Sequence, residues 1–256
     1  MKKGIVIITI GIIGCLIAVF ALTQKPSQDE TSLVENTVEQ TVVLEKPDTL
    51  ITIDTSHEGL TVFYPKYKSI DLVCAISSPE DDSTAIFCCP AAFTGEILSE
   101  LKHTNIAGNH VSGGELHKGY SCGKNTGAFV WYKGKWEFLL KNYATELKVA
   151  ADSSGMAVGQ NMIIHNHVKQ PLFRSNSFQY RALCELEGKL CIIQSNESIR
   201  YSDFVDMLSQ AGVKHALYLD MGGWNHSWYR EYEDSALTYI HNNPHKNYTN
   251  WLTFYR

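Results

Sequence analysis

The sequence has few charged residues and no excess of basic ones. Charged residues make up 19% of its 256 residues, and the formal net charge is −5. Soluble domains carry roughly 25% charged residues, and a chain without a basic excess lacks the usual electrostatic case for binding nucleic acid. Since 44% of the residues are hydrophobic, a disordered chain is not expected either. The length suffices for one large domain or two small ones.

The seven cysteines include no Cys-x-x-Cys pair, which is the spacing typical of zinc and redox sites. Residues 88–89 are adjacent cysteines in an apolar run, rather than in the basic surroundings that activate a nucleophile. Glu187-Gly188 predicts a two-residue hairpin turn, which places Cys184 directly opposite Cys191. The sequence leaves two interpretations of this pair open, a cross-strand disulfide or two small buried thiols.

Long hydrophobic runs are absent except at residues 4–22, where 15 of 19 residues are apolar and none is charged. About 20 such residues span a bilayer as a helix, and Lys2 and Lys3 before the run predict an N-terminus in the cytoplasm. We predict that residues 1–22 form a transmembrane anchor, with a cleaved signal peptide as the alternative. Both predict a periplasmic or extracellular domain, which is secreted if the segment is cleaved.

The remaining chain divides into two parts by composition. Residues 23–50 contain six acidic and two basic residues, with no glycine and no aromatic residue. Such a segment buries little apolar area, so we predict an acidic flexible linker. Residues 51–256 contain 27 of the 28 aromatic residues and all ten histidines, and we predict that they form one folded domain.

Short strand-like runs separated by turns dominate the predicted domain, with two helices among them. Thr94 is predicted to cap a helix that extends to about Lys102. Ser202 is predicted to cap a second helix over residues 203–211, which Gly212 ends. Antiparallel hairpins with few helices predict the α+β class, as a single domain of mixed, largely antiparallel β-sheet.

The strongest candidate site follows a predicted buried strand at residues 216–219. Asp220 comes directly after this strand, so its carboxylate should emerge at the rim of the sheet, where ligand sites cluster. Gly222 and Gly223 allow backbone to approach a ligand closely. Polar side chains interleaved with tryptophans over residues 224–230 suit a sugar. The alternative is an aspartate that caps a glycine-rich turn, with the tryptophans in the core.

Residues 202–223, with the sequence SDFVDMLSQAGVKHALYLDMGG, resemble the C-terminal signature of the phosphodiester glycosidase family. This is the domain of the N-acetylglucosamine-1-phosphodiester alpha-N-acetylglucosaminidase type, whose signature is a helix, a glycine, a strand and Leu-Asp-Gly-Gly-Gly-Ser. The Arg-Ala step at Arg181, the Gly188-Lys189 turn and a glutamine-containing strand at Gln160 agree in the same order. The resemblance covers roughly residues 85–256.

Three departures separate the sequence from that family pattern. Met221 follows the aspartate where the family has glycine, and Trp224 replaces the serine. The family's upstream Asn-Gly-Gly-Phe-Phe has only residues 90–96 as a counterpart, and these lack the asparagine. Because of these departures, the resemblance does not identify the substrate of this protein.

The resemblance implies an exported, anchored glycoside hydrolase that cleaves a glycosyl phosphodiester or a related envelope glycan. Asp220 would act as general acid or base, or would stabilise an oxocarbenium-like transition state. Arg181 would clamp a phosphate or carboxylate, unless it is an exposed hairpin arginine. Glu96 is predicted as the second carboxylate, and no cofactor or metal is expected. The predicted substrate-binding residues are Gln160, Asn109, His110, Gly222, Gly223, Trp224 and Asn225.

Two alternatives compete with this interpretation. His165 and His167 would share a strand face at a spacing of two, and with His110 they could serve a metal-dependent hydrolase. A non-catalytic glycan-binding module would fit the altered signature and the high aromatic content. The predicted partners are a carbohydrate or glycosyl-phosphate substrate and, through residues 1–22, a membrane. Nucleic acid is not an expected partner, and the oligomeric state is left open.

Overall fold

The computed structural model describes residues 48–256, apart from positions 97, 99, 124, 125, 172, 173, 175, 222–224 and 244–248. Within the described residues, two large β-sheets and a two-stranded sheet of β11 (Ser177–Phe178) and β14 (Ile199–Arg200) account for the named strands. The smaller of the two large sheets contains β17 (Leu237–Asn242), β16 (His226–Arg230), β4 (Ala85–Pro90), β18 (Trp251–Tyr255) and β3 (Ser69–Val73), in that order.

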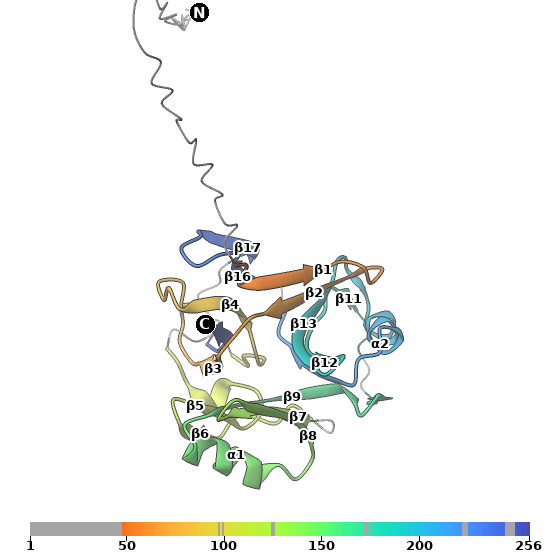
Figure 1. Cartoon of the computed structure of the whole chain (residues 1–256). Helices are drawn as coiled ribbons and strands as arrows, with labels where there is room; N and C mark the ends of the chain where they lie inside the picture. Colours follow the sequence, from red (N-terminus) through yellow and green to blue (C-terminus); the bar gives the residue numbers. More distant parts are fainter. Residues whose placement is uncertain are drawn as a thin grey trace, which may run out of the picture. The chain divides into compact units, whose positions relative to one another are not determined.

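The larger sheet has eleven strands and curves around the smaller one (Figure 1). Its main path is β1 (Ile51–Asp54), β2 (Leu60–Pro65), β13 (Lys189–Ser195), β12 (Arg181–Leu186), β15 (His215–Leu219), β9 (Met156–His165), β5 (His110–Ser112) and β6 (Glu115–His117). Three further strands complete this sheet: β7 (Thr126–Tyr132) and β10 (Val168–Lys169) pair with β9, and β8 (Lys135–Leu140) pairs with β7.

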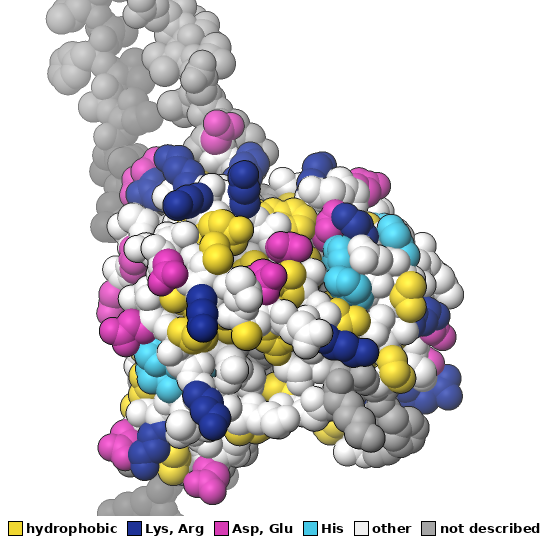
Figure 2. Space-filling model, turned by 90° about the horizontal axis from the view of Figure 1, so that it is seen from below, with side chains coloured by type: hydrophobic (Ala, Val, Ile, Leu, Met, Phe, Trp, Pro, Cys, Tyr) yellow, Lys and Arg dark blue, Asp and Glu magenta, His cyan; other side chains and the backbone are white. Residues whose placement is uncertain are grey.

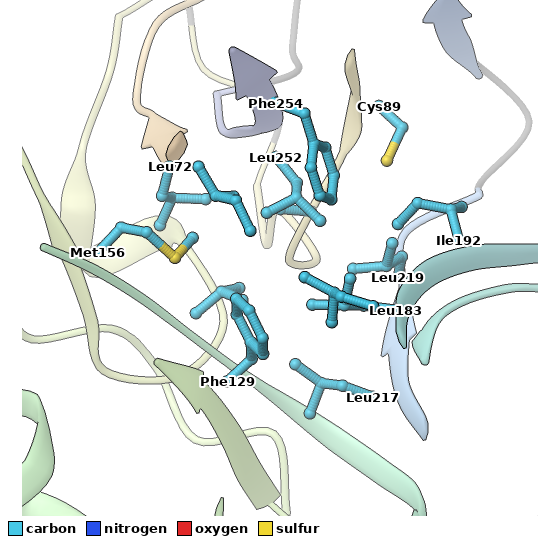
Figure 3. Close-up of a cluster of buried hydrophobic side chains, with 14 of the residues drawn as sticks. Leu72, Cys89, Phe129, Met156, Leu183, Ile192, Leu217, Leu219, Leu252 and Phe254 are labelled. Carbon is cyan, nitrogen blue, oxygen red and sulfur yellow. The ribbon is translucent and has the colours of Figure 1, made fainter. Parts of the chain in front are cut away.

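The main core lies between the two large sheets. Buried side chains of both sheets meet there, as Figure 3 shows for Leu252 and Phe254 of β18, Leu183 of β12, Leu217 of β15 and Phe129 of β7. Fully burying one such side chain contributes about 1.5–3 kcal/mol. Alternate residues of β12, β13 and β15 point to the opposite face, because successive side chains of a strand alternate.

Two α-helices lie on the outside of the larger sheet in the described part of the chain. The helix α2 (Tyr201–Gln210) buries Phe204 and Leu208 in a second core with the outer residues of β12, β13 and β15. The helix α1 (Ala144–Asp152) buries Leu147 and Ala150 against β5, β7 and β9. The predicted second helix is confirmed as α2, with Gly212 at a φ of 84° shortly after its end. Its predicted cap is wrong, because the helix begins at Tyr201 and Ser202 lies inside it. The helix α1 was not predicted from the sequence.

The predicted α+β class with a mixed sheet is wrong. Every pair of named strands in the described residues is antiparallel, and the two α-helices have only nine and ten residues. The fold is therefore mostly antiparallel β-sheet with peripheral helices. The predicted transmembrane segment at residues 1–22 lies outside the described residues, and no helix among those described is long and apolar enough to cross a membrane.

The predicted helix from Thr94 is absent in the described residues of that segment. Thr94 instead forms an isolated β-bridge with Ile106, and a short 3-10 turn occupies His103–Asn105. The side chain of Asn105 accepts a hydrogen bond from the Glu96 N–H (2.7 Å) and donates one to the Glu96 carbonyl (2.8 Å). These bonds occupy backbone groups that a helix would use, and no local pattern reveals them.

The predicted hairpin is confirmed in its register. Glu187 and Gly188 have φ of 52° and 72°, as a turn of type I′ requires, and Cys184 lies directly opposite Cys191. Both thiols are free and buried. The structure therefore matches the second interpretation of this pair, two small buried thiols.

Candidate active site

Three chain segments from both large sheets meet at Asp220. This half-buried residue follows the last residue of β15, and its N–H donates to the Ala91 carbonyl (2.9 Å). The Ala91 N–H donates in turn to the Asn250 carbonyl (3.3 Å). The Asn250 side chain accepts from the Ala92 N–H (2.6 Å) and donates to the Ala92 carbonyl (3.0 Å). Backbone bonds of both sheets thus fix the position of Asp220.

A buried polar cluster lies beside Asp220 on the core face of the larger sheet. Nε and Nη2 of Arg181 donate to Oε1 of Gln194, at 3.2 and 2.6 Å. Nη1 donates to Oδ1 of Asn225 (3.1 Å), and Nη2 also donates to Oγ of Ser227 (2.9 Å). Nε2 of Gln194 lies 2.8 Å from Nε2 of His241. We call Arg181, Gln194, Asn225, Ser227 and His241 the Arg181 cluster. It joins β12 and β13 to β16 and β17.

The Arg181 guanidinium is fully buried, so it is not an exposed hairpin arginine. A charge in this position costs free energy unless hydrogen bonds compensate it, and the cluster supplies them. Burial, together with the charge of Arg181, lowers the pKa of His241 to about 4. His241 is therefore neutral near pH 7, and one of its ring nitrogens can accept a hydrogen bond from the Gln194 amide.

Gln160 belongs to the same end of the larger sheet. Met162 lies opposite Leu217 in the register of β9 and β15, so Gln160, two residues before Met162, lies toward the end of β15 that carries Leu219. Leu219 in turn pairs with Arg181 on β12. Met162 and Leu219 both point into the main core, so Gln160 shares that face with Arg181.

Two buried amide donors near this end have no hydrogen-bond partner among the described residues, Nε2 of Gln160 and Nδ2 of Asn225. A buried polar atom without a partner costs about 1–3 kcal/mol. Such atoms in a folded protein call for an explanation, and a bound ligand or water is a common one. Both residues were predicted to bind substrate, and their free donors suit sugar hydroxyls.

A second arginine lies over aromatic rings on the outer face of β15. The rings of Phe93 and Tyr218 are 5.2 Å apart between centroids. The guanidinium carbon of Arg174 lies 5.0 Å from the first centroid and 4.7 Å from the second. Nε of Arg174 is buried and has no hydrogen-bond partner among the described residues. We call Arg174, Phe93 and Tyr218 the Arg174 cluster.

Burial and, to a smaller degree, the Asp220 carboxylate raise the pKa of two nearby tyrosines. Burial raises the pKa of Tyr218 well above its ordinary value, Arg174 opposes this rise, and Asp220 adds to it. Burial also raises the pKa of Tyr120 to about 12, with smaller contributions from Cys122 and Asp220. Oη of Tyr120 donates to the Phe93 carbonyl (3.5 Å). Asp220 therefore lies near two tyrosines, Tyr218 and Tyr120, whose hydroxyl groups remain protonated at any ordinary pH.

The other predicted site residues lie outside these two clusters. Glu96 is exposed, in the loop that Asn105 holds by the hydrogen bonds described above. Asn109 is exposed as well, and its side chain accepts a bond from the Gly119 N–H (3.3 Å). Gly222, Gly223 and Trp224 lie outside the described residues.

The prediction that His165 and His167 share a strand face is wrong, because His165 ends β9 and His167 has a φ of 63° in the turn that follows. His110 lies far from both. His110 is buried in β5 beside His103 and His117. Val111 pairs with Ala157 near the start of β9, whereas His165 ends β9 and contacts His215. Eight residues of strand separate these points, which is about 26 Å. Figure 2 shows histidines at separate edges of one face, among charges of both signs. His110 and His165 therefore cannot share one ion.

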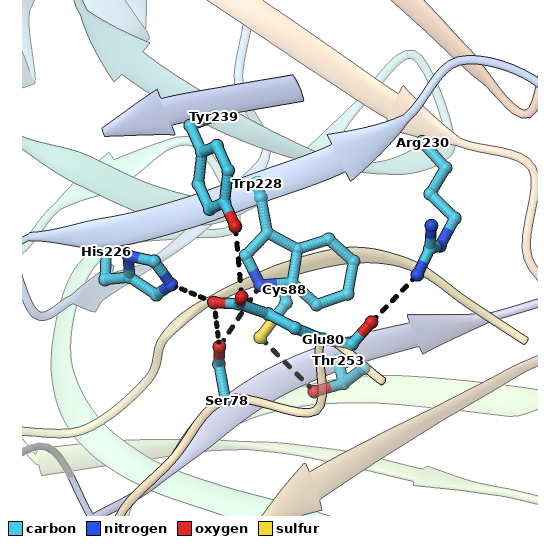
Figure 4. Close-up of polar contacts among 8 residues, drawn as sticks. All are labelled: Ser78, Glu80, Cys88, His226, Trp228, Arg230, Tyr239 and Thr253. Atoms are coloured by element: carbon cyan, nitrogen blue, oxygen red, sulfur yellow. Dashed lines mark hydrogen bonds and ion pairs between the residues drawn. The ribbon is translucent and has the colours of Figure 1, made fainter. Parts of the chain in front are cut away.

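A further polar cluster holds the loop before β4 against the smaller sheet (Figure 4). The Glu80 carboxylate accepts from Oγ of Ser78 (2.9 Å) and Oη of Tyr239 (3.0 Å) and contacts Nε2 of His226. Nη2 of Arg230 donates to the Glu80 carbonyl (2.9 Å). Burial acts to raise the pKa of Glu80, but these side-chain hydrogen bonds outweigh it and hold the pKa below its ordinary value. These bonds give the cluster a structural role.

Six residues of the two arginine clusters were not predicted as site residues from the sequence: Gln194, Ser227, His241, Arg174, Phe93 and Tyr218. One of them left a usable signal. A turn at Glu187-Gly188 that places Cys184 opposite Cys191 also places Gln194 opposite Arg181. The other five come from segments whose proximity depends on the packing of the two sheets.

No protein-family model and no curated protein matches the sequence. Among solved structures, a hypothetical protein from Synechocystis is similar with a TM-score of 0.43 and 12% identity, over 80% of this chain and 61% of that one. The catalytic domain of zebrafish N-acetylglucosamine-1-phosphodiester alpha-N-acetylglucosaminidase, auto-inhibited by its pro-peptide, is similar with a TM-score of 0.54 and 12% identity, over 82% of this chain and 83% of that one. The chain therefore shares the fold of a glycosidase domain, and membership of that family stays a prediction.

Proposed function

We propose that this protein is a hydrolase that cleaves the glycosidic bond of a sugar-1-phosphodiester at Asp220. The fold shared with the zebrafish glycosidase domain supports the class of reaction. The observation that carries the proposal is the position of Asp220, held by both sheets between a buried cluster of hydrogen-bonding groups and a cluster of aromatic rings with an arginine. A sugar needs apolar faces and directed hydrogen bonds, and a phosphodiester adds a need for a cation.

Asp220 acts as a general acid or base at the leaving oxygen, or it stabilises the positive charge that develops on the sugar ring. Its half-buried position beside Tyr218 and Tyr120 keeps bulk water from screening that interaction. The backbone bond to Ala91 holds the residue in place. Removing a general acid or base of this kind typically costs a rate factor of about 10²–10⁴.

Arg174 is the cation that contacts the phosphate in this proposal. Its guanidinium is already oriented by Phe93 and Tyr218, and its Nε has no hydrogen-bond partner among the described residues. A phosphate oxygen would provide that partner, and a charge-assisted hydrogen bond is about twice as strong as a neutral one. The Phe93 ring, which is only partly buried, would offer an apolar face to the sugar.

Arg181 takes a positioning role in this proposal, although the sequence predicted it as the clamp. Its guanidinium fixes the Oδ1 side of Asn225, which leaves Nδ2 of Asn225 as a free donor. Nε2 of Gln160 is a second free donor on the core face. We propose that these two donors bind sugar hydroxyls.

Glu96 is proposed as the second carboxylate. It follows Gly95, where an added Cβ would lie 3.4 Å from the Tyr120 ring, and Asp220 influences the same tyrosine. The loop of Glu96 and Asp220 therefore share a neighbour. Replacement by glutamine should lower turnover with little change in stability, because the Glu96 side chain is exposed.

The experiment is a panel of substrates offered to the wild-type protein. It contains sugar-1-phosphodiesters of different sugars, the matching sugar-1-phosphates, and aryl glycosides without phosphate. We expect release of the free sugar and a phosphomonoester from at least one phosphodiester, with slower or no cleavage of the uncharged glycosides. Binding without turnover would contradict the proposed chemistry and would make the protein a glycan-binding module instead.

A further inference from the structure

A group of soft and borderline metal ligands lies outside the proposed active site. Cys74 follows β3, His103 lies in the 3-10 turn and His110 begins β5. One ligand atom of each lies within 4.8 Å of the other two. Nδ1 of His103 and Nε2 of His110 are 3.0 Å apart. Zinc bonds of about 2.0–2.3 Å in a tetrahedral site separate neighbouring ligand atoms by about 3.3–3.8 Å, so small side-chain movements bring the three atoms to these distances.

The surroundings orient these side chains as in a metal site. Nδ1 of His110 lies 3.1 Å from the Gly108 carbonyl, and an N–H donated there leaves Nε2 with its lone pair toward His103 and Cys74. Metal-binding histidines commonly donate their other nitrogen to a backbone carbonyl in this way. The His117 ring stacks on that of His103, with 3.5 Å between centroids and 2° between planes, and so limits how His103 can turn. A thiol with two imidazoles suits zinc better than calcium or magnesium, which prefer oxygen ligands.

We propose that Cys74, His103 and His110 bind one zinc ion. Solvent would complete a four-coordinate site, because the described residues within reach supply three ligand atoms. Binding requires the thiolate, so the Cys74 proton is released to solvent as the zinc–sulfur bond forms. The proposal does not depend on the proposed hydrolase activity.

The ion would hold a segment that leads to the active site. It would join β3 and β5 to the 3-10 turn, whose Asn105 binds the backbone of Glu96 on both sides. The Phe93 carbonyl accepts a bond from the Ala107 N–H (2.8 Å), next to the same turn. Zinc would therefore stabilise the 3-10 turn and, through these bonds, the backbone at Phe93 and Glu96, in a structural role rather than a catalytic one.

The test uses the full-length protein without an affinity tag, purified without chelator. We expect about one zinc per chain by elemental analysis. We also expect the cobalt-substituted protein to show the thiolate-to-cobalt charge-transfer absorption of a cysteine ligand. Cys74→Ser and His103→Gln should each weaken zinc binding about a hundredfold or more in a competition titration with a chromophoric chelator. Both replaced side chains are only partly buried, and circular dichroism checks that the variants fold.

Matched controls use the same residue types outside the cluster. Cys122 is also a free, half-buried thiol, and His167 is exposed. Cys122→Ser and His167→Gln should bind zinc as the wild type does. The proposal is overturned if the wild type binds no stoichiometric zinc, if the cobalt protein lacks the thiolate band, or if Cys74→Ser binds as tightly as Cys122→Ser. The cobalt spectrum is measured on the wild type, so it tests the proposal even if a variant misfolds.

Discussion

Arg181 and Arg174 lie near the same end of β15 on opposite faces, and their surroundings differ in kind. The guanidinium of Arg181 is fully buried, and its nitrogens donate to Gln194, Asn225 and Ser227. That of Arg174 is half-buried over two rings, and its Nε has no hydrogen-bond partner among the described residues. An arginine whose guanidinium nitrogens donate hydrogen bonds to other protein groups stabilises the fold. An arginine with a nitrogen that has no such partner is suited to bind a ligand.

The largest effect that this comparison predicts is on stability, from Arg181→Gln. Removing the guanidinium leaves three buried acceptor groups without their donors and a cavity between the sheets. We expect the free energy of unfolding to fall by about 3–5 kcal/mol, measured by urea denaturation. Arg200→Gln is the control, since Arg200 is exposed and paired with Asp203 at 2.9 Å. Equal midpoints for the two variants would refute a structural role for Arg181.

The next effect falls on activity, from Arg174→Gln. The loss of a charge-assisted contact with phosphate should lower kcat/KM for a sugar-1-phosphodiester about 10- to 100-fold. The unfolding free energy should change by about 1 kcal/mol or less, the value of a cation–π contact. Lys189→Gln removes a comparable contact, 5.9 Å above the Tyr64 ring, and should leave kcat/KM unchanged. A loss of stability as large as that of Arg181→Gln would erase the distinction between the two arginines.

The smallest effect concerns pH and the Arg181 cluster. The pKa of His241 is lowered to about 4 in the folded protein by burial and by Arg181, against about 6.5 in the unfolded chain. The unfolded chain therefore binds the proton first as the pH falls. The contribution of His241 to stability is present above pH 6.5 and is lost as the pH falls through about 4.

His241→Gln should consequently reduce the pH dependence of the unfolding free energy between pH 7 and 4 by about 1–2 kcal/mol, after allowance for partial exposure. Urea denaturation at a series of pH values measures this difference. The exposed His167→Gln serves as control and should follow the wild-type curve. If His241→Gln kept the full wild-type pH dependence of the unfolding free energy, a group other than His241 would be responsible for the acid sensitivity.

Local chemistry made part of this molecule predictable. The turn at Glu187-Gly188 has the residue types that positive φ requires, so the hairpin and the opposition of Cys184 and Cys191 followed from it. The helix α2 followed from its apolar spacing and from Gly212. The buried strand before Asp220 followed from its continuous apolar run.

Contacts between distant segments made the rest unpredictable. Asn105 binds the backbone of Glu96 nine residues away and replaces the predicted helix by an irregular loop. Arg174 lies in a stretch without helix or strand periodicity, and only the packing of Phe93 against Tyr218 gives it a site. The α+β class was wrong because periodicity detects strands but does not show how they pair across two sheets.

The proposed activity depends above all on Asp220, so Asp220→Asn tests it most directly. The measurement is the single-turnover hydrolysis of the best sugar-1-phosphodiester, together with its binding, compared with Asp206→Asn on the exposed side of α2. Asp220→Asn should bind the substrate but hydrolyse it about 10²–10⁴-fold more slowly, while Asp206→Asn should match the wild type. Hydrolysis by Asp220→Asn at the wild-type rate would contradict the assignment of this site.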